Sequence, residues 1–260
     1  SATTVDTHDK REMFLNTIQQ LDQVRSDFDE LTHLGCKMCL HQVKIQYLSP
    51  ALAGLDNINY DIDEDGYNDY QINDPFAQHF INETDIVIRF LTLILTQSCM
   101  NIIIALLVDQ LTTRMEKFVL SSSHKEWYNE GEFHHYFSML GAIQFDQDIR
   151  RLLNYFTSIS DLPIRRKFSR LLDMCTLLSL ESLDEFHDLY SSTATTNSSS
   201  GMLHHQQQQQ SSSSFRLSKD EIKKILFIRR FPKHEIDALL RDYHYSNNYT
   251  RNNTIITSLP

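Results

Sequence analysis

Glycine, proline and cysteine are all scarce in this chain of 260 residues, which contains six, five and four of them respectively. Tight turns and strand-rich folds consume glycine and proline, so their scarcity favours long helices. Four cysteines are too few for a disulfide scaffold, and no secretory leader precedes them, so we expect a reducing compartment. The length is enough for one large or two modest domains with a buried core.

Basic residues are also few relative to acidic ones. Lysine and arginine together number 24 against 34 aspartates and glutamates, which gives a net charge of −10. Non-specific binding to nucleic acid depends on a basic surface that contacts phosphates. The composition therefore argues against nucleic acid as a general partner.

The chain lacks an uninterrupted apolar stretch of the kind that spans a membrane. Its longest apolar stretch, residues 90–108, would just span a bilayer. Gln97, Ser98 and Asn101 lie at the centre of that stretch, where unpartnered polar side chains are costly in lipid. We therefore predict a buried helix, in a protein that contacts membranes peripherally at most.

A complete calcium motif is missing from the acidic segment "DIDEDGYND" at residues 61–69. Asp61, Asp63 and Asp65 occupy positions 1, 3 and 5 of an EF-hand loop and Gly66 occupies position 6, but position 12 is Ile72 instead of glutamate. We prefer a solvated acidic loop, with a calcium loop as the alternative interpretation.

The cysteines do not form a convincing metal or redox site. Cys36 and Cys39 make a CxxC followed by His41, but Cys99 and Cys175 are isolated, whereas tetrahedral zinc needs a second pair of ligands. The CxxC falls within an amphipathic helical pattern and not at a strand-to-helix junction, as a thioredoxin-like site would. We interpret the pair as two thiols on a helix.

Two pairs of adjacent histidines offer no better site. His134 and His135, and His204 and His205, are sequence neighbours and therefore point to different faces of a helix. Nucleophile elbows, phosphate-binding loops and paired catalytic carboxylates are not found. We expect no enzyme activity and no cofactor.

Apolar residues at helical spacing dominate the pattern that is present. A first long helix into the low forties is predicted by the stripe Phe14, Ile18, Leu21, Val24, Phe28 and Leu31. After an acidic loop, Asp74 is predicted to cap a helix with Pro75 in its first turn, which continues to about residue 120. Tyr67 or Tyr70 should fold back onto the bundle.

The second half contains two amphipathic helices separated by Pro163, then a low-complexity segment that cannot bury enough apolar surface to fold. Structure should resume where Ser218 caps a helix and Glu221 completes a capping box.

The predicted organisation of the whole chain has six parts. They are a long bundle helix at 1–48, an acidic loop at 49–73, the main bundle at 74–190, a disordered loop at 191–214, a C-terminal helical subdomain at 215–242 and a flexible tail at 243–260.

A basic stretch stands out in this acidic chain. It comprises Arg150, Arg151, Arg165, Arg166, Lys167 and Arg170. These cations could face anionic lipid, although their positions spread around the helices in the manner of a solvated surface. A peripheral module that binds phosphoinositides is therefore the alternative function.

Three blocks, in this order, carry a family resemblance: "GYNDYQINDPFAQHFI", "GAIQFDQDIRRLLNYFTSISDLPIRRKFSRLLDMCTLLSLESL" and "FRLSKDEIKKILFIRRF". They cover most of residues 60–240 and resemble the C-terminal region of subunit 4 of the conserved oligomeric Golgi complex. The first block includes a family surface motif, formed by Asn68, Asp69, Tyr70, Asn73, Asp74 and Pro75.

The resemblance implies an all-α fold of antiparallel helical bundles, as in helical-rod tethering complexes. It implies a non-enzymatic subunit that acts in retrograde intra-Golgi transport, scaffolds sibling subunits and assists SNARE assembly. The expected partners are the other subunits of the complex, and Golgi SNAREs and their regulators. The expected location is cytoplasmic, peripheral on the cytosolic face of Golgi membranes. The resemblance also places a structural ion pair between Arg170 and Glu221, which would join the subdomain at 215–242 to the bundle.

Overall fold

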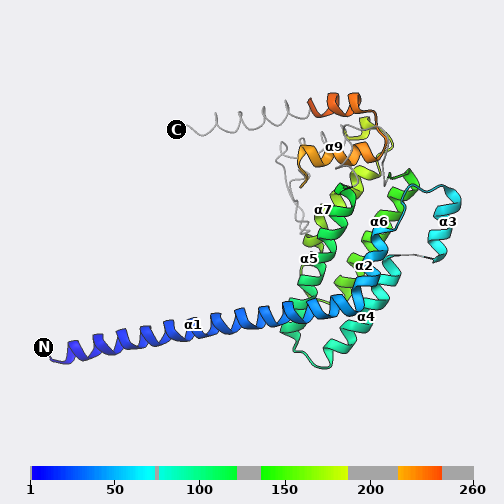
Figure 1. The fold of residues 1–260 in the computed structure, drawn as a ribbon. Coiled ribbons are helices and arrows are strands. Elements are labelled where there is room, and N and C mark those ends of the chain that lie inside the picture. Colours follow the sequence, from blue (N-terminus) through cyan, green and yellow to red (C-terminus); the bar gives the residue numbers. More distant parts are fainter. Residues whose placement is uncertain (1, 74–75, 122–135, 187–215, 242–260) are drawn as a thin grey trace, which may run out of the picture.

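A computed structural model describes residues 2–73, 76–121, 136–186 and 216–241 (Figure 1). Within these ranges every regular element is a helix, which confirms the all-α prediction. The helices are α1 (Ala2–Val43), the π-helix η1 (Lys44–Leu48), α2 (Ser49–Asp56), α3 (Glu64–Asn73), α4 (Ala77–Thr92), α5 (Gln97–Ser121), α6 (Met139–Ser158), α7 (Ile164–Leu178) and α9 (Lys219–Ile228). Residues 233–241 are also helical. Across these described helices, none combines the length and the apolarity needed to cross a membrane.

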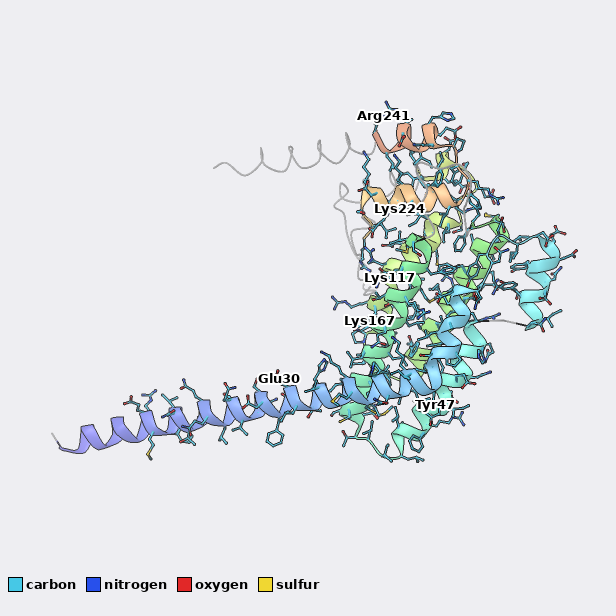
Figure 2. All side chains as sticks on the ribbon, in the orientation of Figure 1. Glu30, Tyr47, Lys117, Lys167, Lys224 and Arg241 are labelled. Atoms are coloured by element: carbon cyan, nitrogen blue, oxygen red, sulfur yellow. The ribbon has the colours of Figure 1, made fainter. Side chains whose placement is uncertain are left out.

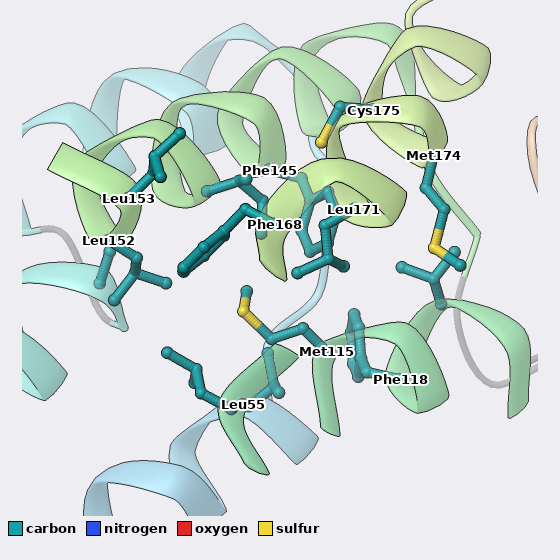
Figure 3. Packing of buried hydrophobic residues seen from close by; sticks show 14 of the residues in the cluster. Leu55, Met115, Phe118, Phe145, Leu152, Leu153, Phe168, Leu171, Met174 and Cys175 are labelled. Atoms are coloured by element: carbon teal, nitrogen blue, oxygen red, sulfur yellow. The ribbon is translucent and has the colours of Figure 1, made fainter. Parts of the chain in front are cut away.

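The core lies where α5, α6 and α7 meet. Met115 and Phe118 of α5, Phe145 of α6 and Phe168 of α7 point toward one another (Figure 3), and all four are buried. Each comes from the apolar stripe of its helix, so the 3.6-residue period is what turns these side chains inward. Burying a large apolar side chain stabilises a fold by about 1.5–3 kcal/mol, so these four side chains contribute substantially to stability.

Helix α1 extends far out of the bundle (Figure 1), although the prediction assigned all of residues 1–48 to the bundle. Cys36 and Leu40, near its end, are buried. The predicted stripe from Phe14 to Leu31 is exposed. The prediction is therefore wrong for most of the helix, because nothing in the described chain lies against that stripe.

The expected acidic loop at 49–73 is also wrong, since it contains α2 and α3. Pro50 occupies the first turn of α2, where the missing amide donor costs nothing. Helix α3 begins after Asp63, whose Oδ1 accepts from the Gly66 N–H at 2.9 Å. A side-chain acceptor before the first turn is the usual N-cap arrangement, which explains how this acid-rich sequence forms a helix.

The single helix predicted from 74 to about 120 is two helices. Helices α4 and α5 form a hairpin whose turn lies at residues 93–96 (Figure 1). Thr96 Oγ1 accepts from the Cys99 N–H at 3.4 Å at the start of α5. The turn contains neither glycine nor proline, so no local signal in the sequence predicts it. The long apolar stretch thus folds back on itself, with Leu93 at the tip and 83% exposed.

Three predicted features lie outside the described residues. They are the low-complexity loop at 191–214, the tail at 243–260, and the histidine pairs at 134–135 and 204–205. All three stay predictions.

Candidate functional site

Arg170 of α7 joins three parts of the chain. Its Nη2 donates to Glu221 Oε1 at 2.8 Å, and its Nε donates to Glu116 Oε2 at 3.0 Å. Its Nη1 donates to the backbone oxygen of Arg216 at 2.6 Å, just before α9. One guanidinium therefore contacts α5, the segment before α9, and α9 itself.

Glu221 serves two purposes at the start of α9. Its Oε2 accepts from the Ser218 N–H at 2.7 Å, while Ser218 Oγ accepts from the Glu221 N–H at 3.3 Å. The capping box at Ser218 and Glu221 is thus present together with the Arg170 contact. A carboxylate has two acceptor oxygens, so the two roles do not compete.

The electrostatics of this pair fit a half-buried contact. The side chains of Arg170 and Glu221 keep 33% and 23% of their surface exposed. Burial opposes ionisation of Glu221, but hydrogen bonds from Arg170 and Ser218 outweigh it and hold the pKa of that carboxyl below its ordinary value of 4.5. The pair is therefore charged at neutral pH.

Sequence reasoning missed a second arginine that anchors α9. Arg229, at the end of α9, donates from Nη1 to the Phe137 backbone oxygen at 2.8 Å and from Nη2 to the Leu180 backbone oxygen at 3.2 Å. The adjacent Arg230 pairs with Asp61. The "FIRRF" block held these residues, but a sequence pattern does not show which carbonyls a guanidinium reaches.

The acidic segment is attached to α6 by polar side chains. Gln71 Nε2 donates to the amide oxygens of Gln144 and Gln147, each at 2.8 Å. Gln147 Nε2 donates to the Tyr67 hydroxyl at 2.9 Å, and the Tyr70 hydroxyl donates to the Asn59 backbone oxygen at 2.9 Å. Both tyrosines singled out from the sequence thus contact the rest of the molecule.

Beneath this attachment lies a buried pair that the sequence did not reveal. The Tyr60 hydroxyl donates to Asp148 Oδ2 at 2.8 Å, and Gln144 Nε2 donates to Asp148 Oδ1 at 2.9 Å. Burial raises the pKa of Tyr60 well above its ordinary value, and the Asp148 charge raises it further, so the hydroxyl stays protonated. Both oxygens of the Asp148 carboxylate therefore accept a hydrogen bond inside the protein.

Four residues of the family surface motif lie on α3. Asn73 Nδ2 donates to Asp69 Oδ1 at 2.6 Å, and Asn68 lies on the same helix. Helix α4 has Phe76 at its N-cap, and the side chain of Phe76 makes no cap. The cap predicted for Asp74 stays a prediction. Asp74 and Pro75 lie outside the described residues.

The basic stretch does not form one continuous cationic face. Arg150 pairs with Asp146 at 2.6 Å, Lys167 with Asp109 at 2.5 Å, and Arg170 with two glutamates. Arg165 and Arg166 are exposed on α7. Half of the predicted cations are thus neutralised by acids of the chain itself.

Three of the candidate metal residues make other contacts. Asp63 caps α3 and Asp61 pairs with Arg230, so the half calcium motif is a helix start. Cys36 is buried with its thiol directed at the Cys99 backbone oxygen, and burial raises its pKa. Among the described residues, no group of three or more histidines, cysteines or acids is placed to hold a metal ion.

These contacts define the class of protein. Arginines, glutamines and tyrosines join one helix to another, and large apolar side chains fill the space between them. Such an arrangement is suited to presenting helix faces to other proteins. The chain is an all-helical bundle domain.

Comparison with known proteins gives the family. The family model described as "Conserved oligomeric Golgi complex subunit 4, C-terminal" matches residues 3–224. Because that match covers most of the chain, the chain belongs to this family.

The curated relatives agree with this assignment. Those named conserved oligomeric Golgi complex subunit 4 include proteins from Arabidopsis thaliana, 25% identical over 88% of this chain, and from Homo sapiens, 26% identical over 83%. The protein from Dictyostelium discoideum is 27% identical over 66%. The chain corresponds to 27% of the Arabidopsis relative and 24% of the human one, or about a quarter of each.

Proposed function

We propose that the chain is the C-terminal helical part of a non-enzymatic subunit of a vesicle-tethering complex at the Golgi. The observation that carries the proposal is the family match over residues 3–224, which runs from α1 through the bundle into α9. In this role the chain scaffolds sibling subunits, binds Golgi SNAREs and their regulators, assists SNARE assembly, and acts in retrograde intra-Golgi transport. It works on the cytosolic face of Golgi membranes as a peripheral protein.

The geometry supports a scaffolding role in two ways. The polar side chains described above are used to fix helices to one another, which gives rigid surfaces that a partner can recognise. Arg170 and Arg229 attach α9 to the main bundle, so the second and third blocks of the family resemblance are held together. Rigidity of this kind lowers the conformational entropy that binding would otherwise cost.

The alternative, a module that binds phosphoinositides, has less support. Arg165 and Arg166 remain exposed, but their neighbours Lys167 and Arg170 are paired with acids of the chain. Membrane attraction contributes about 1 kcal/mol for each basic residue near an anionic surface, so two arginines give only weak binding. Flotation with phosphoinositide vesicles should leave most of the protein unbound.

Affinity purification tests the proposal directly. The tagged chain is expressed in cells of its source organism, and co-purifying proteins are quantified against tag alone. We expect the other subunits of the conserved oligomeric Golgi complex to be enriched and the tagged chain to colocalise with a Golgi marker. A folded chain that enriches none of these subunits, or that lies elsewhere in the cell, would contradict the proposal.

A further inference from the structure

The projecting part of α1 carries a continuous apolar surface, here called the α1 seam. The seam residues are each between 50% and 67% exposed. They are Phe14, Leu21, Val24, Phe28, Leu31 and Met38. In Figure 2 the side chains of this part of α1, Glu30 among them, stand clear of the other helices. So large an apolar surface on a described helix requires a partner.

The spacing of the seam specifies the kind of partner. Phe14, Leu21 and Phe28 are seven residues apart, and Val24 and Leu31 fall three residues after two of them. This is the a and d pattern of a heptad repeat, whose period of 3.5 residues keeps a seam turned toward one supercoiled helix. The matching surface is therefore the apolar seam of another α-helix.

The bundle of the chain does not cover this seam. Where α1 reaches the bundle, Cys36 and Leu40 are buried, while Met38 between them remains 65% exposed. The seam therefore continues past the first bundle contacts on a different side of the helix. It is a separate surface and not a frayed extension of the core.

Charge argues against an antiparallel second copy of the chain as the partner. An antiparallel copy would align the apolar layers well, with Val24 facing Phe28 and Leu21 facing Leu31. The same register brings Asp27 beside its counterpart Asp27 and Arg25 beside its counterpart Arg25. Like charges at these flanking positions oppose association, and flanking charges are what select coiled-coil partners.

Acidic residues outnumber basic ones on the part of α1 that carries the seam. Asp27 directly flanks the seam, Asp22, Asp29 and Glu30 lie further round the helix, and the single cation between Phe14 and Leu31 is Arg25. An anionic membrane surface would be repelled by these acids, and a seam that winds around a helix does not present one flat face to lipid. Lysines or arginines on a partner helix would instead complement them.

We propose that the α1 seam binds a single amphipathic helix, supplied by another subunit of the complex, with apolar a and d residues and basic flanking residues. The inference rests on the proposed function, because the family belongs to a multisubunit complex. It adds the surface, the geometry and the chemistry of the contact. Helix α1 is then the docking arm of this domain.

The test measures binding of the 260-residue chain to each purified sibling subunit from the same organism. The double variant Leu21→Asp/Phe28→Asp places two charges in the seam. The matched control Gln19→Asp/Ser26→Asp places the same charges on the opposite side of α1, where both residues are exposed. We expect one subunit to bind the wild type and the control alike, and to bind the seam variant at least about tenfold more weakly, a change of 1.4 kcal/mol.

A charge variant tests whether basic residues of the partner interact with the acidic residues of α1. Asp27→Lys/Asp29→Lys should also weaken binding of that subunit and reduce its salt dependence. All three double variants should unfold at the wild-type temperature, because these α1 side chains lie outside the core. A lower melting temperature in the seam variant alone would show that the seam serves folding instead, and would overturn the inference.

Other outcomes also decide the matter. If the complex co-purifies from cells but the seam variant retains it fully, the proposed function stands and the α1 inference fails. A dimer in solution that the seam variant dissociates would identify a second copy as the partner. Flotation that depends on the seam would identify lipid. Protection of Phe28→Cys from thiol labelling in a longer form of the polypeptide, before any subunit is added, would show that its own chain covers the seam.

Discussion

Helices α1 and α7 have similar sequence patterns, but the apolar side of α7 is buried and that of the projecting part of α1 is exposed. Both carry an apolar residue every three or four positions, yet Phe168 and Leu171 of α7 are fully buried while Phe28 of α1 is 66% exposed. The pattern tells which side of a helix must be covered. It does not tell whether the cover comes from the same chain, and this decides between a core and an interface.

The largest expected effect contrasts one phenylalanine from each helix. Phe168→Ala removes a buried ring from the centre of the bundle and should lower the free energy of unfolding by about 3–5 kcal/mol. Phe28→Ala removes a ring with no core contacts and should change it by less than about 0.5 kcal/mol. Denaturant unfolding of the two variants and the wild type measures both values.

A stability loss of similar size for both variants would break the comparison, because it would show that the α1 seam packs against the bundle in solution. The slope of the free energy against denaturant is a check on each variant. It should stay at the wild-type value, since neither substitution alters how much surface unfolding exposes.

Two glycines sharpen the same contrast. A Cβ built on Gly141 of α6 would lie 1.6 Å from the Tyr60 backbone oxygen, whereas one on Gly35 of α1 meets nothing within 4 Å. Gly141→Ala must push two segments apart and should destabilise the protein by about 3 kcal/mol. Gly35→Ala should be neutral or stabilise α1 by up to about 1 kcal/mol, because alanine favours the helix. Thermal unfolding and helical circular dichroism report both results.

Helix type and the start of α9 could be predicted from the sequence because they depend on local signals. The apolar period and the low glycine and proline content indicated helices. Ser218 and Glu221 are three residues apart, and this spacing alone specifies a capping box. The presence of Arg170 beside Glu221 came from the family resemblance, since local spacing carries no information about a contact 51 residues apart.

The parts that the sequence could not predict depend on three-dimensional context. The turn at 93–96 lacks glycine and proline, and Pro50 acts as a first-turn residue although it resembles a helix stop. The pairing of Tyr60 with Asp148 joins residues 88 apart, and polar residues of this kind look like surface residues in a sequence. The acid-rich composition of residues 61–65 suggested a loop, although one of these acids is the cap of α3.

Arg170 provides the third test, because it fixes α9 to the bundle by polar contacts where α7 is held by apolar ones. Arg170→Ala removes three hydrogen bonds, two of them to carboxylates, from a half-buried site. We expect a loss of about 2 kcal/mol and faster hydrogen exchange in α9 than in α7. Exchange measured by mass spectrometry separates the two helices.

A double-mutant cycle with Glu221→Gln isolates the ion pair, since glutamine keeps an acceptor for the Ser218 amide. The losses should be non-additive by about 1 kcal/mol. The folded-state pKa of Glu221 is lowered, so its contribution is present above the unfolded pKa and is lost as the pH falls through the folded one. The stability difference between wild type and Glu221→Gln should therefore shrink from pH 7 toward pH 3. Additive losses at pH 7 would show that the Arg170–Glu221 ion pair does not stabilise the protein.

The smallest expected effect concerns α3, which buries none of its residues and so lies between the two extremes of α1 and α7. It is held by the Asp63 cap and by the side-chain bonds of Tyr67, Tyr70 and Gln71 to the rest of the molecule. Loss of an N-cap costs about 1 kcal/mol, and here the cost should remain local because no core residue depends on α3. Asp63→Ala should thus speed hydrogen exchange at residues 64–73 severalfold, while the melting temperature falls by a few degrees at most. The control Asp65→Ala, in the exposed first turn, should change the exchange rate much less. Equal exchange in both variants would show that the polar bonds to α6, and not the cap, hold the helix in place.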